Sequence, residues 1–219
     1  GYDPREAVRY HVAVHSILRL ASIPVEISPL ALCNLGKEFR RGREVLQSTD
    51  FSFTRFLVPY LSGYCGWSLF MDCDVLVRSD ISELARMCSI GNLSKSVFVV
   101  KHDYIPVDEK KFLGEVQSKY EKKNWSSVML FNNGRCHKLK PEYVNSAPGL
   151  ALHQFKWTSE DEIGELDSDW NHLVGEQKPN KDAKLVHFTR GGPWFRDYKD
   201  CEFSDEWFSE YRKMTYPMV

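Results

Sequence analysis

The chain of 219 residues has no excess of basic side chains, no apolar run of membrane-spanning length and no cysteine pair with C-x-x-C spacing. Its formal net charge of −1 argues against a nucleic-acid binder, which usually carries a basic excess. The absence of a long apolar run and of a signal peptide argues against a membrane span or a secreted chain. Six scattered cysteines argue against a zinc cluster and favour reduced thiols, so we expect a cytoplasmic protein.

What remains is typical of a globular domain. Hydrophobic residues make up 42% of the chain and charged residues 27%, and the length is sufficient for one domain with a sizeable core. We find no internal repeat, low-complexity tract or linker, and we therefore expect one domain over residues 1–219, either alone or within a longer protein. The turn-like start Gly1-Tyr2-Asp3-Pro4 is unusual for an α/β domain, so we expect a first strand upstream of it.

Helical patterns alternate with short apolar segments along the chain. We expect helices at residues 4–20, 54–62, 82–87 and 108–122, and strands at 25–27, 67–71, 96–100, 127–131 and 183–188. The basic segment 36–47 is expected to be a solvated loop or helix face, and the chain beyond residue 150 to be loop-rich. This alternation predicts an α/β fold whose central, mostly parallel sheet is flanked by helices.

Polar side chains directly follow three of the expected strands. Asp72 and Asp74 follow the strand expected at 67–71, and His102 and Asp103 follow the one at 96–100. His187 lies at the end of the strand expected at 183–188. Open α/β sheets bind ligands at the carboxyl ends of their strands, so we expect these side chains to converge. Two carboxylates in an Asp-x-Asp pattern can bind one hard cation, Mg²⁺ or Mn²⁺, which bridges a diphosphate.

The spacing of Asp72 and Asp74 is a weak signal by itself, because Asp-x-Asp arises by chance about once in a few hundred residues. Asp167 and Asp169 share it without a preceding apolar strand, and we interpret them as a solvated loop. One alternative for the first pair is a turn capped by aspartates. Another is the nucleophile motif of haloacid-dehalogenase phosphatases, although Val75 stands where that motif usually has a small pair.

Several segments in a fixed order carry a more specific signal. They are residues 1–3, 54–61, 70–77, 80–84, 124–132 and 184–194. In order and spacing they resemble glycosyltransferase family 8. The resemblance implies a GT-A fold and a metal-dependent transfer of a hexose or deoxyhexose from a UDP-sugar to a glycan or glycoprotein acceptor, with retention of anomeric configuration. Trp125 and two serines replace the family's small residues, and the acceptor-side motif is not clean, so donor sugar and acceptor stay open.

The resemblance also implies a set of site residues. Asp72, Asp74 and His187 would bind the cation, and imidazole favours Mn²⁺ over Mg²⁺, with a structural histidine as the alternative for His187. The residues implied in binding the nucleotide sugar are Gly1, Tyr2, Asp3, Arg55, Asp72, Cys73, Asp74, Trp125, Ser126, Gly191 and Gly192. Within this set, Asp3 would accept from the uracil N–H, or would alternatively cap a turn.

Catalysis by this resemblance depends mainly on charge. Arg55 would stabilise the departing UDP, with a surface helix charge as the alternative. Asp103 and His102 would hold sugar hydroxyls, with a loop salt bridge as the alternative. An inverting enzyme would instead need a carboxylate base, for which Asp161 or Glu162 is the candidate. A glycan-binding module without catalytic activity is the remaining alternative.

Overall fold

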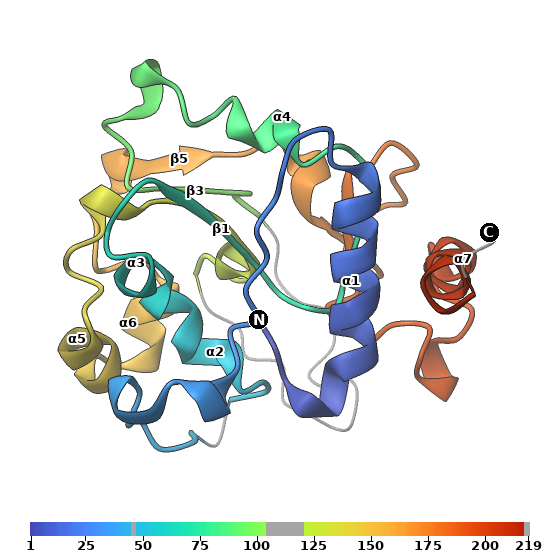
Figure 1. Ribbon diagram of the computed structural model, residues 1–219, viewed down its shortest axis with the longest axis horizontal. Helices are drawn as coiled ribbons and strands as arrows, with labels where there is room; N and C mark the ends of the chain where they lie inside the picture. The colour runs from blue at the N-terminus through green and yellow to red at the C-terminus, as the bar shows by residue number, and fades with distance from the viewer. Residues whose placement is uncertain (45–46, 104–120, 217–219) are drawn as a thin grey trace.

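The computed structural model describes residues 1–44, 47–103 and 121–216, and Figure 1 shows how they are arranged. The expected helix at 108–122 lies almost entirely outside these residues. Helices cover both faces of the strands, which confirms the α/β class. Within the described residues, no helix is both long and apolar enough to cross a bilayer.

The strands form two sheets. The four-stranded sheet has the order β1-β4-β3-β5, with β1 (Trp67–Met71), β3 (Val97–Val99), β4 (Val128–Asn132) and β5 (Ile163–Glu165). The three-stranded sheet has the order β2-β7-β6, with β2 (Val75–Val77), β6 (His172–Leu173) and β7 (Leu185–His187).

The expectation of a mostly parallel sheet is wrong. β4 is antiparallel to both β1 and β3, and β2 is antiparallel to β7, whereas β3–β5 and β6–β7 are parallel. Continuously apolar strands are typical of parallel sheets because such sheets are buried on both faces. Here helices bury both faces of an antiparallel strand, β4, so the apolar pattern did not reveal its direction.

The helices follow the expected periodicity in the first half of the chain. They are α1 (Ala7–Leu20), α2 (Phe51–Thr54), α3 (Val58–Leu61), α4 (Ser82–Ala85), α5 (Pro141–Ser146), α6 (Gly149–His153) and α7 (Ser204–Thr215). The helices expected at 4–20, 54–62 and 82–87 are confirmed. The chain from residue 154 to 203 is rich in loops, as expected, but the short strands β5 and β6 and the final helix α7 were not predicted.

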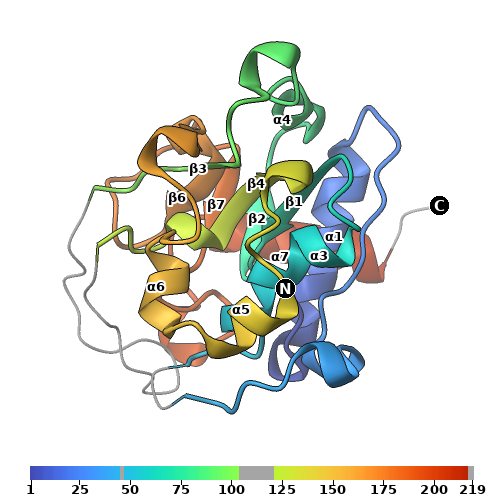
Figure 2. The same ribbon diagram turned by 90° about the vertical axis from the view of Figure 1, so that its left-hand side faces the viewer.

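Alternate side chains of the central strands enter two cores. Val99 of β3 and Met129 of β4 pack with the side chains of α2, α5 and α6. Phe98 and Leu130, one position along, pack with Ala13 of α1 and with α4. Figures 1 and 2 show these helix groups on different sides of the strands. Because side chains alternate between the two faces of a strand, each face of the sheet packs against a different group of helices.

A cavity of about 800 Å³ lies beside β1, at the edge of the four-stranded sheet. Residues 23–31, α1 and β1 line it. The amino group of Gly1 donates to the Met71 carbonyl at 2.7 Å, and Tyr2 forms a parallel bridge with Ala31. The strand expected at 25–27 is wrong, because this segment has no ladder partner within the described residues. The strand expected upstream of Gly1 stays a prediction.

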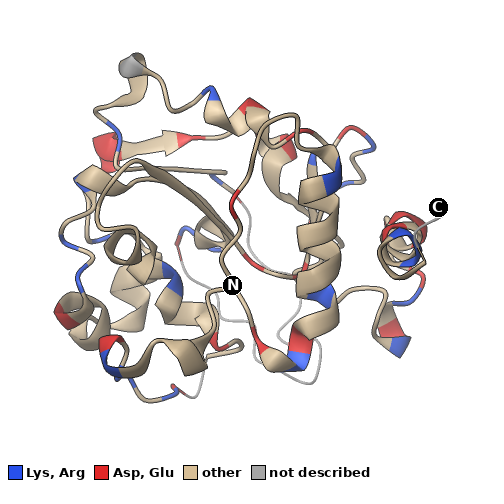
Figure 3. Ribbon diagram, viewed as in Figure 1, with Lys and Arg blue, Asp and Glu red and all other residues tan. Residues whose placement is uncertain are grey.

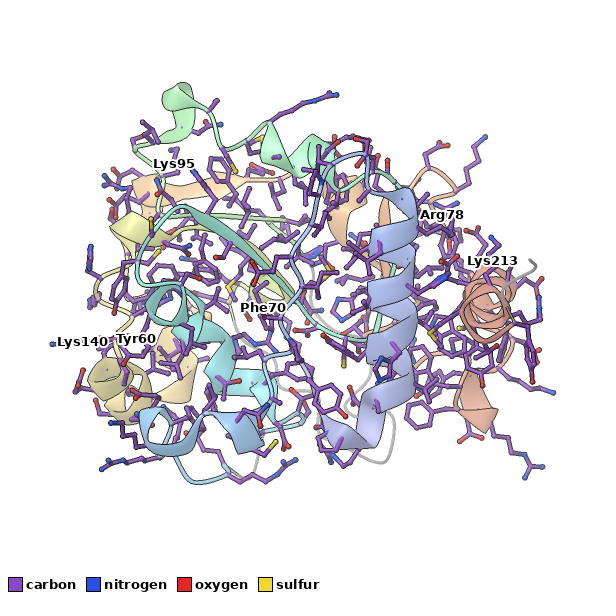
Figure 4. The ribbon with its side chains drawn as sticks, viewed as in Figure 1. Tyr60, Phe70, Arg78, Lys95, Lys140 and Lys213 are labelled. Carbon is purple, nitrogen blue, oxygen red and sulfur yellow. The ribbon has the colours of Figure 1, made fainter. Side chains whose placement is uncertain are left out.

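The last helix, α7, packs on α1, and the two lie side by side in Figure 1. Trp207 of α7 is 2% exposed and packs in a third core with Val12 and Phe188. Its ring also lies 5.0 Å from that of Trp194. Arg78 and Lys213, labelled in Figure 4, lie near this junction of α1, β2 and α7. The C-terminal helix is therefore part of the folded core.

We expect Trp207→Ala to lower the free energy of unfolding by about 3–5 kcal/mol, because it leaves a large cavity between α7 and α1. Urea unfolding followed by circular dichroism measures this. Tyr216→Ala is the matched control, since that aromatic ring is 77% exposed at the end of the same helix, and it should change the value by less than about 0.5 kcal/mol. Equal losses in the two variants would show that α7 is not anchored through Trp207.

Candidate functional site

Three potential metal ligands meet where β1 and β2 are joined. Asp72, Asp74 and His187 each offer a ligand atom within 4.8 Å of the others. The Nε2 atom of His187 lies 3.3 Å from Asp74 Oδ1 and 4.0 Å from Asp72 Oδ2. Two carboxylates and an imidazole are a donor set that suits Mn²⁺ and related divalent ions. The residues therefore fit a divalent cation, and the convergence expected from the sequence is observed.

Strand pairing brings these residues together across more than a hundred positions. In the antiparallel pair of β2 and β7, Val75 lies opposite His187. The N–H of Phe188 donates to the carbonyl of Asp74 at 2.9 Å, which extends the ladder by one bond. Asp72 is held on the other side, since its N–H donates to the Ser127 carbonyl at 2.9 Å. Backbone hydrogen bonds thus set the spacing of the candidate ligands.

The first carboxylate is half-buried beside a buried guanidinium. Burial raises the pKa of Asp72, the nearby charge of Arg55 opposes this rise, and the charge of Asp74 adds to it. Arg55 Nη1 lies 2.9 Å from Asp72 Oδ1 and donates to the Ser126 carbonyl at 2.7 Å. The Arg55 side chain is 6% exposed, so it is no surface charge. A divalent cation would relieve the repulsion between the two aspartates.

A second buried acid–base pair, Glu6 with Arg9, lies close enough to Asp74 to be affected by its charge. The Cys73 thiol donates to Glu6 Oε2 at 3.1 Å. Glu6 in turn pairs with Arg9, and both side chains are 3% exposed. Burial, followed by the charge of Asp74, raises the pKa of Glu6 to about 7, and burial raises that of Cys73 well above its usual value. The Cys73 side chain is therefore occupied within the protein and is not free to bind a nucleotide.

Sequence reasoning missed Glu6 and Arg9. At the start of an amphipathic helix, such residues are typical of a solvated face. A possible signal was their spacing of three, which places opposite charges together on one side of a helix.

The residues that follow β3 and precede β4 lie near His187. His102 is buried, and its Nε2 lies 2.9 Å from the amide nitrogen of Asn171. Burial lowers the pKa of His102 to about 3, so this ring is neutral. Trp125 donates from its indole to the His102 carbonyl at 2.9 Å, and Ser126 Oγ lies 2.8 Å from His153 Nδ1. The Ser126 hydroxyl therefore has an internal partner.

Asp103 lies after β3 and is exposed, and it is the last residue described before the gap at 104–120. Its interpretation as a group that holds sugar hydroxyls stays a prediction.

The two glycines after β7 shape a buried loop. Gly191 has a φ of 129°, a conformation that favours glycine, and its N–H donates to Phe188 at 2.8 Å. A Cβ atom on Gly192 would lie 2.1 Å from the ring of Trp194. The Trp194 ring also lies 5.0 Å from the Arg9 guanidinium. These glycines are therefore required for packing, and their contact with phosphate stays a prediction.

The structure gives Asp3 the role of a turn cap. Its carboxylate is fully buried and accepts from the Arg5 backbone and guanidinium and from the N–H of Asp50. With these donors in place, the alternative of turn capping accounts for Asp3 better than a bond to uracil. Tyr2 is half-buried, with its ring 5.2 Å from that of Tyr10.

The candidate bases Asp161 and Glu162 are wrong, because they lie at the opposite end of the sheet. Glu162 accepts from the N–H of Ser96, at the start of β3, whereas Asp72 follows the far end of β1. A strand of four or five residues separates these ends by about 13–17 Å. In Figure 4, Lys95, which donates to the Asp161 carbonyl, lies far from the central Phe70. The sequence shows that Asp161 and Glu162 adjoin a strand, but it does not show at which end of the sheet these residues lie.

Charged side chains elsewhere are mixed in sign. Figure 3 shows lysine, arginine and acidic residues interspersed over the helices, without one dominant basic face in this view. Trp157 and Trp170 are 4% and 3% exposed and belong to the core.

Comparison with known proteins places this geometry among glycosyltransferase folds. No protein-family model matches the chain. Protein CDI of Arabidopsis thaliana is 46% identical over 219 residues, covering 96% of this chain and 83% of that protein.

Solved structures with a similar fold include three glycosyltransferases. The galactosyltransferase LgtC, in complex with donor and acceptor sugar analogues, is 12% identical with a TM-score of 0.60, covering 100% of this chain and 95% of LgtC. GlyE of Streptococcus pneumoniae is 13% identical with a TM-score of 0.62, covering 95% of this chain and 59% of GlyE. The bifunctional WbbM is 15% identical with a TM-score of 0.62, and the match covers 96% of this chain and 48% of WbbM. At these identities the likeness shows the GT-A fold alone.

The raised pKa of Glu6 predicts a pH dependence of stability in the metal-free protein. The native state holds a proton on Glu6 up to about pH 7, whereas the unfolded carboxyl loses it near pH 4.5. Between these values the native state binds more protons, so this group makes the free energy of unfolding fall as pH rises. We expect Glu6→Gln to make that fall shallower, by at most about 1.4 kcal/mol per pH unit.

Urea unfolding in EDTA at several pH values between 4 and 8 checks this expectation. Glu26→Gln, at an exposed carboxylate, is the matched control and should leave the slope unchanged. A Glu6→Gln slope identical to that of the parent would contradict the prediction.

Proposed function

The chain belongs to the family of Protein CDI from Arabidopsis thaliana, and from its fold and its candidate metal centre we propose that it is a metal-dependent glycosyltransferase. It moves a hexose or deoxyhexose from a UDP-sugar to a hydroxyl of a glycan or glycoprotein acceptor. The observation that carries the proposal is the convergence of Asp72, Asp74 and His187 beside the buried Arg55, in a chain with a GT-A fold. LgtC, which shares this fold, has been solved with donor and acceptor sugar analogues.

The three ligands would hold a divalent cation, with Mn²⁺ favoured by the imidazole. When bound, the cation supplies positive charge to the diphosphate of the donor and so stabilises the departing nucleotide. Arg55 contributes by orientation and charge. Its Nη1 atom lies between Asp72 and the Ser126 carbonyl, so it fixes the carboxylate and favours its ionised form.

The positions of Asp161 and Glu162 fit retention of anomeric configuration better than inversion. An inverting enzyme needs a base near the acceptor, and the two candidates, Asp161 and Glu162, lie at the wrong end of the sheet. In the retaining route, the leaving diphosphate oxygen takes the acceptor proton, and the chain needs only to bind and align the two substrates. Nucleotide contacts through Gly1, Tyr2 and the loop of Gly191 and Gly192 complete the proposal.

The alternatives fit this geometry less well. A haloacid-dehalogenase nucleophile needs a carboxylate that is free to attack, whereas Asp72 is paired with Arg55 in a glycosyltransferase fold. A glycan-binding module without catalytic activity would bind sugar without releasing UDP. A screen of several UDP-sugars for UDP release, with Mn²⁺ and in EDTA, separates these functions and identifies the donor.

We expect Asp72→Ala and Asp74→Ala each to lower metal-dependent UDP release by at least about 100-fold while the fold is retained, because each removes a charged ligand. Asp200→Ala is the control, since its side chain is 87% exposed, and it should keep the parent rate. Rates are compared at saturating Mn²⁺, with circular dichroism as the test of folding. Near-parental turnover in either ligand variant would overturn the site assignment.

His187→Ala should weaken the binding of Mn²⁺ and of UDP together, because one cation joins both ligands. In the parent protein UDP should tighten Mn²⁺, and Mn²⁺ should tighten UDP by the same factor. Calorimetric titration of each ligand, with and without the other, measures this coupling. His172→Ala is a control, as this other buried histidine has its Nε2 atom 3.2 Å from Glu202 Oε2. If the coupling survives in His187→Ala, this residue is a structural histidine.

A further inference from the structure

One buried side-chain amide, that of Asn171, connects His187 with His102 and Ser127. Asn171 ends the helical turn Ser168–Asn171 and is fully buried. Its Oδ1 atom lies 3.1 Å from His187 Nδ1. Its Nδ2 atom lies 2.9 Å from His102 Nε2 and 2.9 Å from Ser127 Oγ.

The hydrogen-bond partners determine which way this amide points. The Ser127 hydroxyl donates its only proton to the Asn124 carbonyl at 2.6 Å, so toward Asn171 it can only accept. The Asn124 carbonyl, 3.4 Å from Asn171 Nδ2, also can only accept. Two acceptors therefore face one end of the side chain, and this end must carry the NH₂ group.

This orientation has a consequence for the imidazole. With its NH₂ group turned toward Ser127, Asn171 presents a carbonyl oxygen to His187, and a carbonyl oxygen accepts but does not donate. A bond at 3.1 Å then requires a proton on His187 Nδ1, and a ring with a single proton therefore has none on Nε2. The Nε2 lone pair is left facing Asp74 and Asp72.

We propose that Asn171 is a positioning residue that holds His187 in the Nδ1–H tautomer, so that its Nε2 lone pair is presented to a cation shared with Asp72 and Asp74. The opposite tautomer would direct an N–H into the site where the cation binds. In proteins, a metal-ligating histidine commonly donates its second ring N–H to an acceptor that fixes tautomer and orientation. Here the acceptor is itself oriented by Ser127 and, through it, by a backbone carbonyl.

The position of Asn171 does not depend on this side chain alone. Asp167 caps the same turn by accepting from the N–H of Asp169 at 3.0 Å. The Asp169 carbonyl accepts from the N–H of Lys184 at 2.8 Å, beside β7. Trp170 is buried in the core next to it. These contacts hold the turn in place, so the amide can be replaced without removing the turn's anchors.

The test compares Asn171→Leu, which removes the acceptor at similar side-chain size, with Asn171→Asp, which keeps an oxygen toward His187. The primary readout is the tautomer of His187 in the metal-free protein, from ¹⁵N-histidine NMR. The resonances are assigned by loss in His187→Gln among the seven histidines of the chain. We expect the Nδ1–H form in the parent and in Asn171→Asp, and a shift toward Nε2–H in Asn171→Leu.

The second readout is the affinity for Mn²⁺ alone, from the electron paramagnetic resonance signal of the free ion. Asn171→Leu should weaken binding by about 10–100-fold, and Asn171→Asp by much less. Asn133→Leu is the matched control, because Asn133 is equally buried and donates to Cys65 and Ser68 at the far end of β4. It should change neither readout.

An unchanged tautomer in Asn171→Leu would overturn the proposal. If Asn171→Leu does not fold, Ser127→Ala, which removes one of the groups that orient the amide, should shift the tautomer in the same direction, and an unchanged tautomer there would overturn the proposal equally. The proposal rests on the metal centre of the proposed function only for its second readout. If the tautomer shifts but the parent does not bind Mn²⁺, the metal centre is wrong and the role of Asn171 in setting the tautomer stands.

Discussion

The antiparallel pairing of β2 with β7 is the contact on which the candidate site depends. It lies directly after the Asp72–Asp74 turn and sets Val75 opposite His187. Neither the aspartates nor the histidine could form a metal site without it, since more than a hundred residues separate them. Because the ladder is made of backbone bonds, the separation of the ligands is fixed by strand geometry and not by flexible side chains. A slip of one residue would turn His187 to the other face of the sheet.

Burying two like charges side by side is costly, and the surroundings of the site offset that cost. Arg55 lies against Asp72, and the pair of Glu6 and Arg9 lies behind Cys73. These groups come from the first helix, from the helical run that begins at α2 and from the strand-end turn, so the site joins elements from the whole first third of the chain. A polar cluster of this kind destabilises a core unless each member is paired. Its presence under an Asp-x-Asp turn is consistent with a site maintained for binding a cation.

The comparison with known folds and the site geometry are independent observations, and both support the proposed metal-dependent glycosyltransferase. LgtC, GlyE and WbbM share the fold at low identity, which by itself says nothing of this chain's substrates. The metal-ligand geometry is a property of the chain's own residues. The sheet register places Asp161 and Glu162 beside the start of β3, away from Asp72. The donor base has the least structural support, because Asp3 is occupied as a turn cap.

Local patterns in the sequence were sufficient for the helix at 4–20 and the apolar strand before Asp72, and the resemblance was sufficient to place His187 beside Asp72 and Asp74. These depend on short-range periodicity and on motif order, which are properties of the chain alone. Strand direction, the pairing of β2 with β7, and the end of the sheet at which Asp161 lies were decided only by the tertiary structure. The sequence of an apolar strand buried on both faces does not show whether the strand is parallel or antiparallel to its neighbours, so its partners are set by long-range packing. The orientation of Asn171 is of this second kind, because it follows from two hydrogen-bond acceptors, Ser127 and Asn124, that the fold alone brings together.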